Sequence, residues 1–390
     1  MKHTGKRGLS ILMALAMTVS LLAGLTVTAA AEMNEAGSTL TLSAEAGLQT
    51  EASRTVRVKN LSGDAASVRL VLAAYDAAGC MLAVNAKQDA LESEGYRDIT
   101  VEYEQGLEIG KLRVFALDPT TCSPLCQAME IQGPFDLMID ETKTVSGGSY
   151  QNVTIAPSVG DGDVSLKGVT ISGDLIVQGG GSNSVTLEEC TVNGRVILDK
   201  AITEESTQLP RLELTNTPIS TLEIQQPAII EATDASSPVD TVKAKADVEI
   251  RGADTAVSNL TIPAGTTDIV TVTVSGGTIG TVAAESDVTV NTAESSFIET
   301  ITARASVAVS SGTVNTITVP ETDPGHDVTV TVSSDAAVGE VAVSSANGVS
   351  IINNGTVFCV SAADAAIADK ITSSGASSTP IDHLLSLTWD

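Results

Sequence analysis

The chain has 390 residues, of which 43% are hydrophobic but just 2% aromatic, and its 48 acidic and 21 basic residues give a formal net charge of −27. A surface this acidic repels nucleic acid and anionic membranes, which argues against both as partners. The apolar residues are mostly Val, Ala, Leu and Ile, which suit stacked pleated strands better than a core built around aromatic rings.

Residues 1–31 have the three parts of a secretory signal peptide: a basic start, an uncharged apolar run and a small-residue end at Ala29, Ala30 and Ala31. Without the three bases of this segment, the net charge of the mature chain is −27 − 3 = −30. We therefore expect a secreted or extracellular protein. Association with the cell envelope is a further expectation. An uncleaved membrane anchor is the alternative, because the apolar run is close to the length that spans a bilayer.

After a polar lead at residues 32–37, residues 38–132 predict a β-sandwich. Alternating runs such as RTVRVKN, ASVRLVLAAYD and KLRVFALD are separated by turn residues such as those at positions 61–64 and 76–79. Short strands spaced at about eight to twelve residues, with turn chemistry between them, are typical of a sandwich or barrel. Six or seven strands in this length predict one immunoglobulin-like module.

The same stretch contains a Tyr-Asp-x-x-Gly hairpin at Tyr75, Asp76 and Gly79 and a late Lys-x-x-x-Phe strand at Lys111 and Phe115. These features resemble the immunoglobulin- or fibronectin-like modules of exported cell-surface proteins of clostridial and related Gram-positive bacteria. The chain departs from that family by having Ala and Leu at the two positions after the Phe, where the family often has Trp. The resemblance covers about a quarter of the chain and implies a spacer or interaction module.

Residues 133–149 predict a linker and a cap, and residues 150–368 a solenoid. Residues 163–177 (DVSLKGVTISGDLIV) align without a gap with residues 184–198 (SVTLEECTVNGRVIL) at an offset of 21. Each copy holds short alternating runs whose single apolar face must be buried against a neighbouring copy. We therefore predict a right-handed parallel β-helix, which makes the whole protein all-β.

Further along the chain, a second register continues at spacings near 20, in runs that begin at Thr221, Thr241, Thr281, Thr300 and Glu340. This spacing predicts nine or ten turns. Residues 369–390 are expected to form a C-terminal cap or tail, in which the single Trp of the chain is used as a buried cap residue.

The turn residues at 160–163 (GDGD) and 179–181 (GGG) also carry a resemblance. They are similar to turns in the parallel β-helix parts of surface proteins from the same bacteria, which often lie beside S-layer homology domains. The resemblance implies a cell-surface role for the solenoid.

Enzyme chemistry is the main rival, since polysaccharide-cleaving sites need acids at close spacing, or acids that hold Ca²⁺ beside a base. The best candidates are Asp161, Asp163 and Asp174 with Arg195 on the next turn. Asp in a Gly-rich turn is also favoured for its backbone geometry alone. Sugar-cleaving clefts usually carry aromatic rings, which are scarce in this region, so we do not assign these residues a catalytic role.

Five cysteines in an exported chain leave at least one unpaired, and Cys122 and Cys126 are close enough in sequence to form a local disulfide. A zinc site would need four convergent ligands, and the mature chain adds just His326 and His383 to the cysteines. We therefore predict neither a metal nor a cofactor.

Together these features predict an exported structural or adhesive protein, in which a non-catalytic β-helix rod is carried on a β-sandwich spacer. Its expected partner is a cell-wall or extracellular glycan or protein, with self-association as a further expectation. Two alternatives stay open: a β-helix polysaccharide lyase or glycoside hydrolase, and a scaffold that assembles end to end.

Overall fold

The computed structural model describes residues 39–50, 53–76, 78–102, 109–133, 135–181, 185–321, 327–345, 347, 349–377 and 381–382. The signal-peptide prediction and the single Trp lie outside these residues. Contacts divide the chain into two compact units, residues 1–137 and 138–390. Within the described residues, no helix is both long enough and apolar enough to span a bilayer.

The first unit consists of two antiparallel sheets with a shared core. Val56 and Ile99 of one sheet and Leu70 and Leu112 of the other are at most 1% exposed and belong to one hydrophobic cluster. The other face of the second sheet is partly buried as well, in a second cluster of Val71, Ala73, Tyr75, Phe115 and Leu117, so the predicted alternation of inward apolar and outward polar residues holds in part of this unit. The first sheet has the order β1 (Leu40–Thr50), β2 (Ser53–Asn60), β5 (Tyr96–Glu102), and the second the order β4 (Met81–Leu91), β3 (Ala66–Tyr75), β6 (Lys111–Leu117), β7 (Met129–Gln132).

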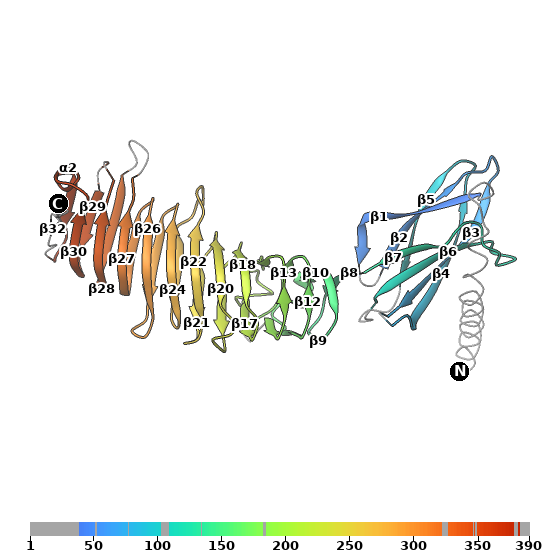
Figure 1. Ribbon diagram of the computed structural model, residues 1–390, viewed down its shortest axis with the longest axis horizontal. Helices are drawn as coiled ribbons and strands as arrows, with labels where there is room; N and C mark the ends of the chain where they lie inside the picture. Colours follow the sequence, from blue (N-terminus) through green and yellow to red (C-terminus); the bar gives the residue numbers. More distant parts are fainter. Residues whose placement is uncertain are drawn as a thin grey trace, which may run out of the picture. The chain divides into compact units, whose positions relative to one another are not determined.

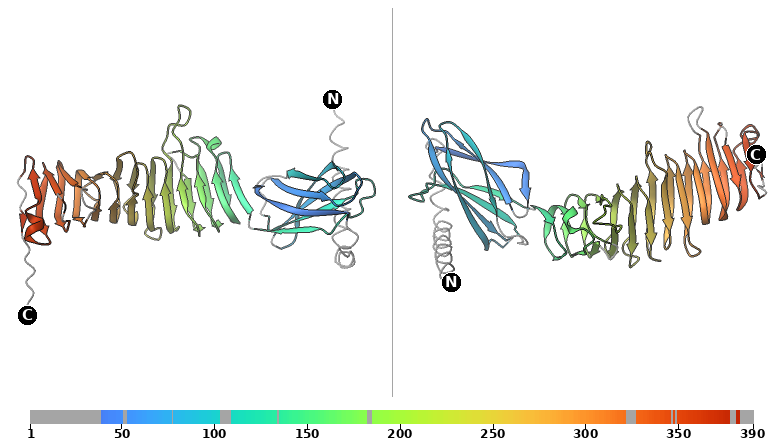
Figure 2. Two further views of the ribbon diagram at one scale, coloured as in Figure 1. Left: turned by 90° about the horizontal axis from the view of Figure 1, so that it is seen from above. Right: turned by 180° about the vertical axis from the view of Figure 1, so that it is seen from behind.

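The second unit is a parallel β-solenoid of about 11 turns over residues 143–374, and its strands stack in sequence order as one column (Figure 1). The same column is seen from above and from behind in Figure 2. Its elements are β8 (Phe135–Ile139), β9 (Lys143–Ser146), β10 (Ser149–Ile155), η2 (Pro157–Val159), β11 (Val164–Lys167), β12 (Thr170–Ile171), β13 (Leu175–Val177), β14 (Val185–Glu188), β15 (Thr191–Val192), β16 (Val196–Leu198), β17 (Arg211–Thr215), β18 (Ile219–Ile224), β19 (Ala228–Ala232), β20 (Val239–Ala244), β21 (Val248–Arg251), β22 (Ala256–Ile262), β23 (Val270–Val274), β24 (Thr278–Ala284), β25 (Val288–Thr292), β26 (Phe297–Ala303), β27 (Val307–Val319), β28 (Val328–Val343), β29 (Val349–Asn353), β30 (Thr356–Ala362), α2 (Ala365–Ala368), β31 (Ile371–Ser374) and β32 (Ile381–Asp382).

The repeat at an offset of 21 is confirmed as one coil of the solenoid. Val164 pairs with Val185 and Leu175 with Val196, in each case as parallel neighbours. The later register is confirmed as well: Thr221 pairs with Thr241, and Thr281 with Thr300. The prediction of nine or ten turns was slightly low.

The solenoid extends past both predicted ends. At the start, β9 pairs with β11 inside the stretch predicted as linker and cap, and at the other end β31 pairs with β29 inside the predicted tail. Both strands have four residues. Of these, just Val145 is buried in β9 and none is buried in β31, so the short runs carry almost no alternating signal.

Three strands build each of the two coils that begin with β11 and β14, and two build the coil before them and most later ones. β11, β12 and β13 lie on three faces, and β14, β15 and β16 repeat them. From β18 onward the second and third faces share one strand, since Ile219 and Leu222 of β18 continue separate ladders. Inside the column, Val, Ile and Leu stack on their equivalents in the neighbouring coils, and most are fully buried.

We expect Leu222→Ala to lower the free energy of unfolding by about 2–5 kcal/mol, because it leaves a cavity between two coils. Leu222 is fully buried and stacks between Val196 and Val242. Urea unfolding of the purified chain measures the change. Thr221→Ala on the partly exposed face of the same strand is the control and should change stability by less than about 1 kcal/mol. Equal effects of the two substitutions would contradict this packing.

Candidate functional site

Asp174 and Arg195, two of the predicted site residues, form an ion pair between adjacent coils. They occupy equivalent turns, before β13 and before β16, and Arg195 Nη2 lies 2.7 Å from Asp174 Oδ2. Arg195 Nη1 also lies 3.3 Å from Glu223 Oε1 of β18, so the guanidinium links three successive coils. The hydrogen bond from Arg195 lowers the pKa of Asp174. These contacts favour one stacking register of the three coils. They also leave the Asp174 carboxylate paired with a cation.

Asp161 pairs with a different cation, the buried Lys200. Lys200 is 1% exposed, and its Nζ donates to Asp161 Oδ1 at 2.6 Å and to the backbone oxygens of Gly180 at 2.6 Å and Gln208 at 2.7 Å. All three donors of the ammonium group are therefore used. Hydrogen bonding from Lys200 is the main reason that the pKa of Asp161 is lowered to about 2.

Lys200 and Asp161 together hold the long connection between β16 and β17. The Asp161 carboxylate also accepts from Ser206 Oγ at 2.8 Å and from the backbone N–H groups of Thr207 and Gln208. Asp161, Gly180 and Gln208 lie in the turns that enter three successive coils. One buried ammonium group thus ties these turns to each other.

Three of the four predicted residues consequently lie in two separate networks, and Asp163 lies in neither. Asp174 binds Arg195, Asp161 binds Lys200, and the backbone oxygen of Asp163 accepts from the Lys143 N–H at 3.3 Å. Sequence reasoning missed both Lys200 and Glu223. Lys200 is 39 residues away from Asp161, and no local motif signals a contact of that range. Among the described residues, no cluster of three or more His, Cys, Asp or Glu is arranged to hold a metal ion.

The disulfide expected between Cys122 and Cys126 is not formed, and both residues are free thiols. Cys126 is 6% exposed and belongs to the hydrophobic core of the first unit, and this burial raises its pKa to about 11. Cys122 instead lies in the turn after β6, where its Sγ is 3.8 Å from Arg69 Nη1. The two side chains therefore lie in different environments.

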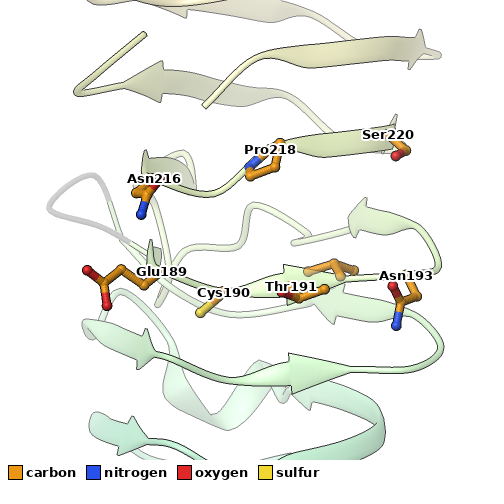
Figure 3. Close-up of a pocket in the computed structure, with 8 residues that line it drawn as sticks. Glu189, Cys190, Thr191, Asn193, Asn216, Pro218 and Ser220 are labelled. Carbon is orange, nitrogen blue, oxygen red and sulfur yellow. The ribbon is translucent and has the colours of Figure 1, made fainter. Parts of the chain in front are cut away.

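A groove of about 630 Å³ opens on the solenoid surface between two successive coils. Glu189, Thr191 and Asn193 form one row of outward side chains, and Asn216, Pro218 and Ser220 form the matching row one coil later. Figure 3 shows Glu189 and Asn216 at one end, Asn193 and Ser220 at the other, and Thr191 and Pro218 between them. Buried Cys190 and Val192 complete the lining. Sequence reasoning missed this groove because its two rows come from the coil whose spacing is 27 rather than 21.

Comparisons with known proteins give no family. No family model matches the chain, and no curated protein matches it. Among solved structures, a calcium-binding mutant of Bacteroides uniformis beta-glucuronidase 2 matches with 10% identity and a TM-score of 0.19, over 60% of this chain. The match spans about a third, 36%, of the length of that protein. A likeness this low carries no argument about activity.

We expect Asp161→Asn to destabilise the protein at neutral pH but not in strong acid. The pKa of Asp161 in the folded state is lowered to about 2, whereas an Asp side chain in the unfolded chain has a pKa of about 3.9. The stabilisation that the Asp161 carboxylate gives the folded state is therefore fully present above about pH 3.9. The contribution is lost as the pH falls from about 4 towards 2. Urea unfolding of both proteins between pH 6 and pH 2 measures this. A stability difference that stays constant over that range would contradict the assignment.

Proposed function

We propose that the protein is an exported structural or adhesive element of a bacterial cell surface or its surroundings. In this proposal a right-handed β-solenoid rod is carried on an immunoglobulin-like β-sandwich spacer. The observation that carries it is the stacked parallel ladder of about 11 turns, whose inward Val, Ile and Leu residues make a stiff column. Such a column presents repeated polar faces to a partner.

The charged residues of the solenoid support this proposal. Lys167 pairs with Glu188, Arg211 with Glu231 and Arg304 with Glu285, in each case between adjacent coils. Together with the Arg195 and Lys200 networks, these pairs place cations and acids where they fasten one coil to the next. Individually, exposed pairs contribute little stability, but they favour one stacking register.

Export is supported by the sequence of residues 1–31 and by the strongly acidic composition. The resemblance of the N-terminal module and of the Gly-rich turns to surface proteins of Gram-positive bacteria supports a place at the cell envelope. A cell-wall or extracellular glycan or protein is the partner that this location offers.

Co-sedimentation of residues 32–390 with purified Gram-positive cell walls and with insoluble extracellular polysaccharide tests the proposal. We expect saturable binding to at least one of these materials and no increase in soluble reducing or unsaturated sugar. Light scattering of the chain alone is the control that separates binding from self-association. Release of sugar would favour the lyase or hydrolase alternative, and a chain that binds none of the materials would contradict the adhesive role.

A further inference from the structure

We infer that the groove between Glu189 and Ser220 is a binding site for a short, hydroxyl-rich stretch of glycan, with the Glu189 carboxylate as its main acceptor. This inference rests on the proposed adhesive function and names the place where it is exercised. Three independent features of the groove support it: an interrupted strand ladder, a strained acidic residue and a set of polar side chains without partners among the described residues.

The ladder on the second face of the solenoid stops at this groove. β12 stacks on β10 and β15 stacks on β12, but among the described strands none pairs with β15 from the next coil. Pro218 stands at the position that would continue the ladder, and proline has no N–H to donate. The ladder resumes with Ile219, which pairs with Val239.

The interruption is local, because the other two faces remain paired across the same step. β14 pairs with β17, and β16 pairs with β18. In addition, the Thr217 hydroxyl accepts from the N–H of Cys190 at 3.0 Å, which satisfies one backbone donor that the missing strand pair leaves. The two coils are thus joined on two faces, and the groove lies on the third face, where no strand pair forms between them.

Glu189 occupies a backbone position at which the two preceding coils have glycine. Gly147, Gly168 and Glu189 have φ values of 74°, 62° and 54°, and each is separated from the next by one coil of 21 residues. The left-handed conformation is free for glycine but strained for a residue with a Cβ. Asn216, on the opposite row, has φ 46°. Such residues concentrate at functional sites, where the side chain has a use that offsets the strain.

The side chains of the groove are available to a ligand. Nearby Glu188 is paired with Lys167 at 2.6 Å, and Asp174 with Arg195, whereas no cation or donor within the described chain contacts the Glu189 carboxylate. The side chains of Asn193 and Ser220, at the other end, likewise make no hydrogen bond to described residues. The groove therefore offers a carboxylate at one end, and an amide and a hydroxyl group at the other.

This set of groups fits a sugar better than an ion. Sugar hydroxyls both donate and accept, which matches a carboxylate, two amides and a hydroxyl, while Pro218 and the Thr191 methyl provide an apolar surface between them. Calcium takes 6–8 oxygen ligands and is usually held by several carboxylates, and the groove has one. The volume of about 630 Å³ lies within the range of about 300–1,000 Å³ that is typical of small-molecule sites.

The test uses residues 32–390 and four neutral trisaccharides as probes: triacetylchitotriose, cellotriose, maltotriose and mannotriose. Saturation-transfer NMR measures their contact with the protein, and titration measures their affinity. We expect at least one trisaccharide to bind the wild-type chain. Glu189→Gly should weaken that binding at least tenfold, because the ligand loses a charge-assisted hydrogen bond.

Glu189→Gly also separates a binding role from a structural one. Since glycine relieves the left-handed strain, the melting temperature of this variant should be no lower than that of the wild type. The matched control is Glu94→Gly: Glu94 is an exposed Glu with φ 54° in the first unit, outside the groove. It should show the same conformational relief and unchanged trisaccharide binding.

The outcomes distinguish this site from the proposed function. If none of the four trisaccharides binds, or if Glu189→Gly binds as tightly as the wild type, the assignment of the groove is overturned. In that event, cell-wall co-sedimentation that is equal for Glu189→Gly and the wild type leaves the adhesive role intact on another face. If Glu94→Gly loses binding to the same extent, the effect does not come from the groove and the inference fails.

Discussion

The hydrogen-bonded ladder between successive coils is the constraint on which the rest of the solenoid depends. A coil of about 20 residues has one apolar row per strand and cannot bury it alone, so it is ordered by the coils on either side. Backbone pairing sets the vertical spacing, and that spacing places each inward Val, Ile or Leu on its equivalent in the next coil. This explains why the composition is rich in small β-branched residues and poor in rings.

The same constraint determines how much could be predicted from the sequence. Residues 163–198 revealed the coil because two copies with unchanged length follow each other, and Thr221 and Thr241 revealed it again one turn apart. The coil from Val185 to Leu212 was invisible at that spacing, because it carries a longer connection. The alternation of inward and outward residues can be read within each strand. An insertion between strands changes the spacing of the repeat but leaves that alternation unchanged.

The candidate site was harder to predict for a different reason. An acidic residue in a Gly-rich turn looks the same in sequence whether it is catalytic or structural. The side chain that it pairs with, which distinguishes the two roles, lies one coil or more away along the chain. For Asp161 that partner is the buried Lys200, and for Asp174 it is Arg195 with Glu223 beyond. The groove exists because Pro218 has no N–H to donate to the neighbouring strand. The sequence alone does not show which strand lies opposite Pro218, so it does not reveal the gap.

Lys200 acquires a further meaning when the column is considered under load. A rod pulled along its axis transmits the same force through every junction between coils, so the junction that has lost one of its three ladders would be the first to part. The turns joined by Lys200 enter the coils on both sides of that junction, through Gly180 and Gln208. The buried ammonium group of Lys200, with all its donors used, therefore cross-links the two coils at the junction where one strand ladder is missing.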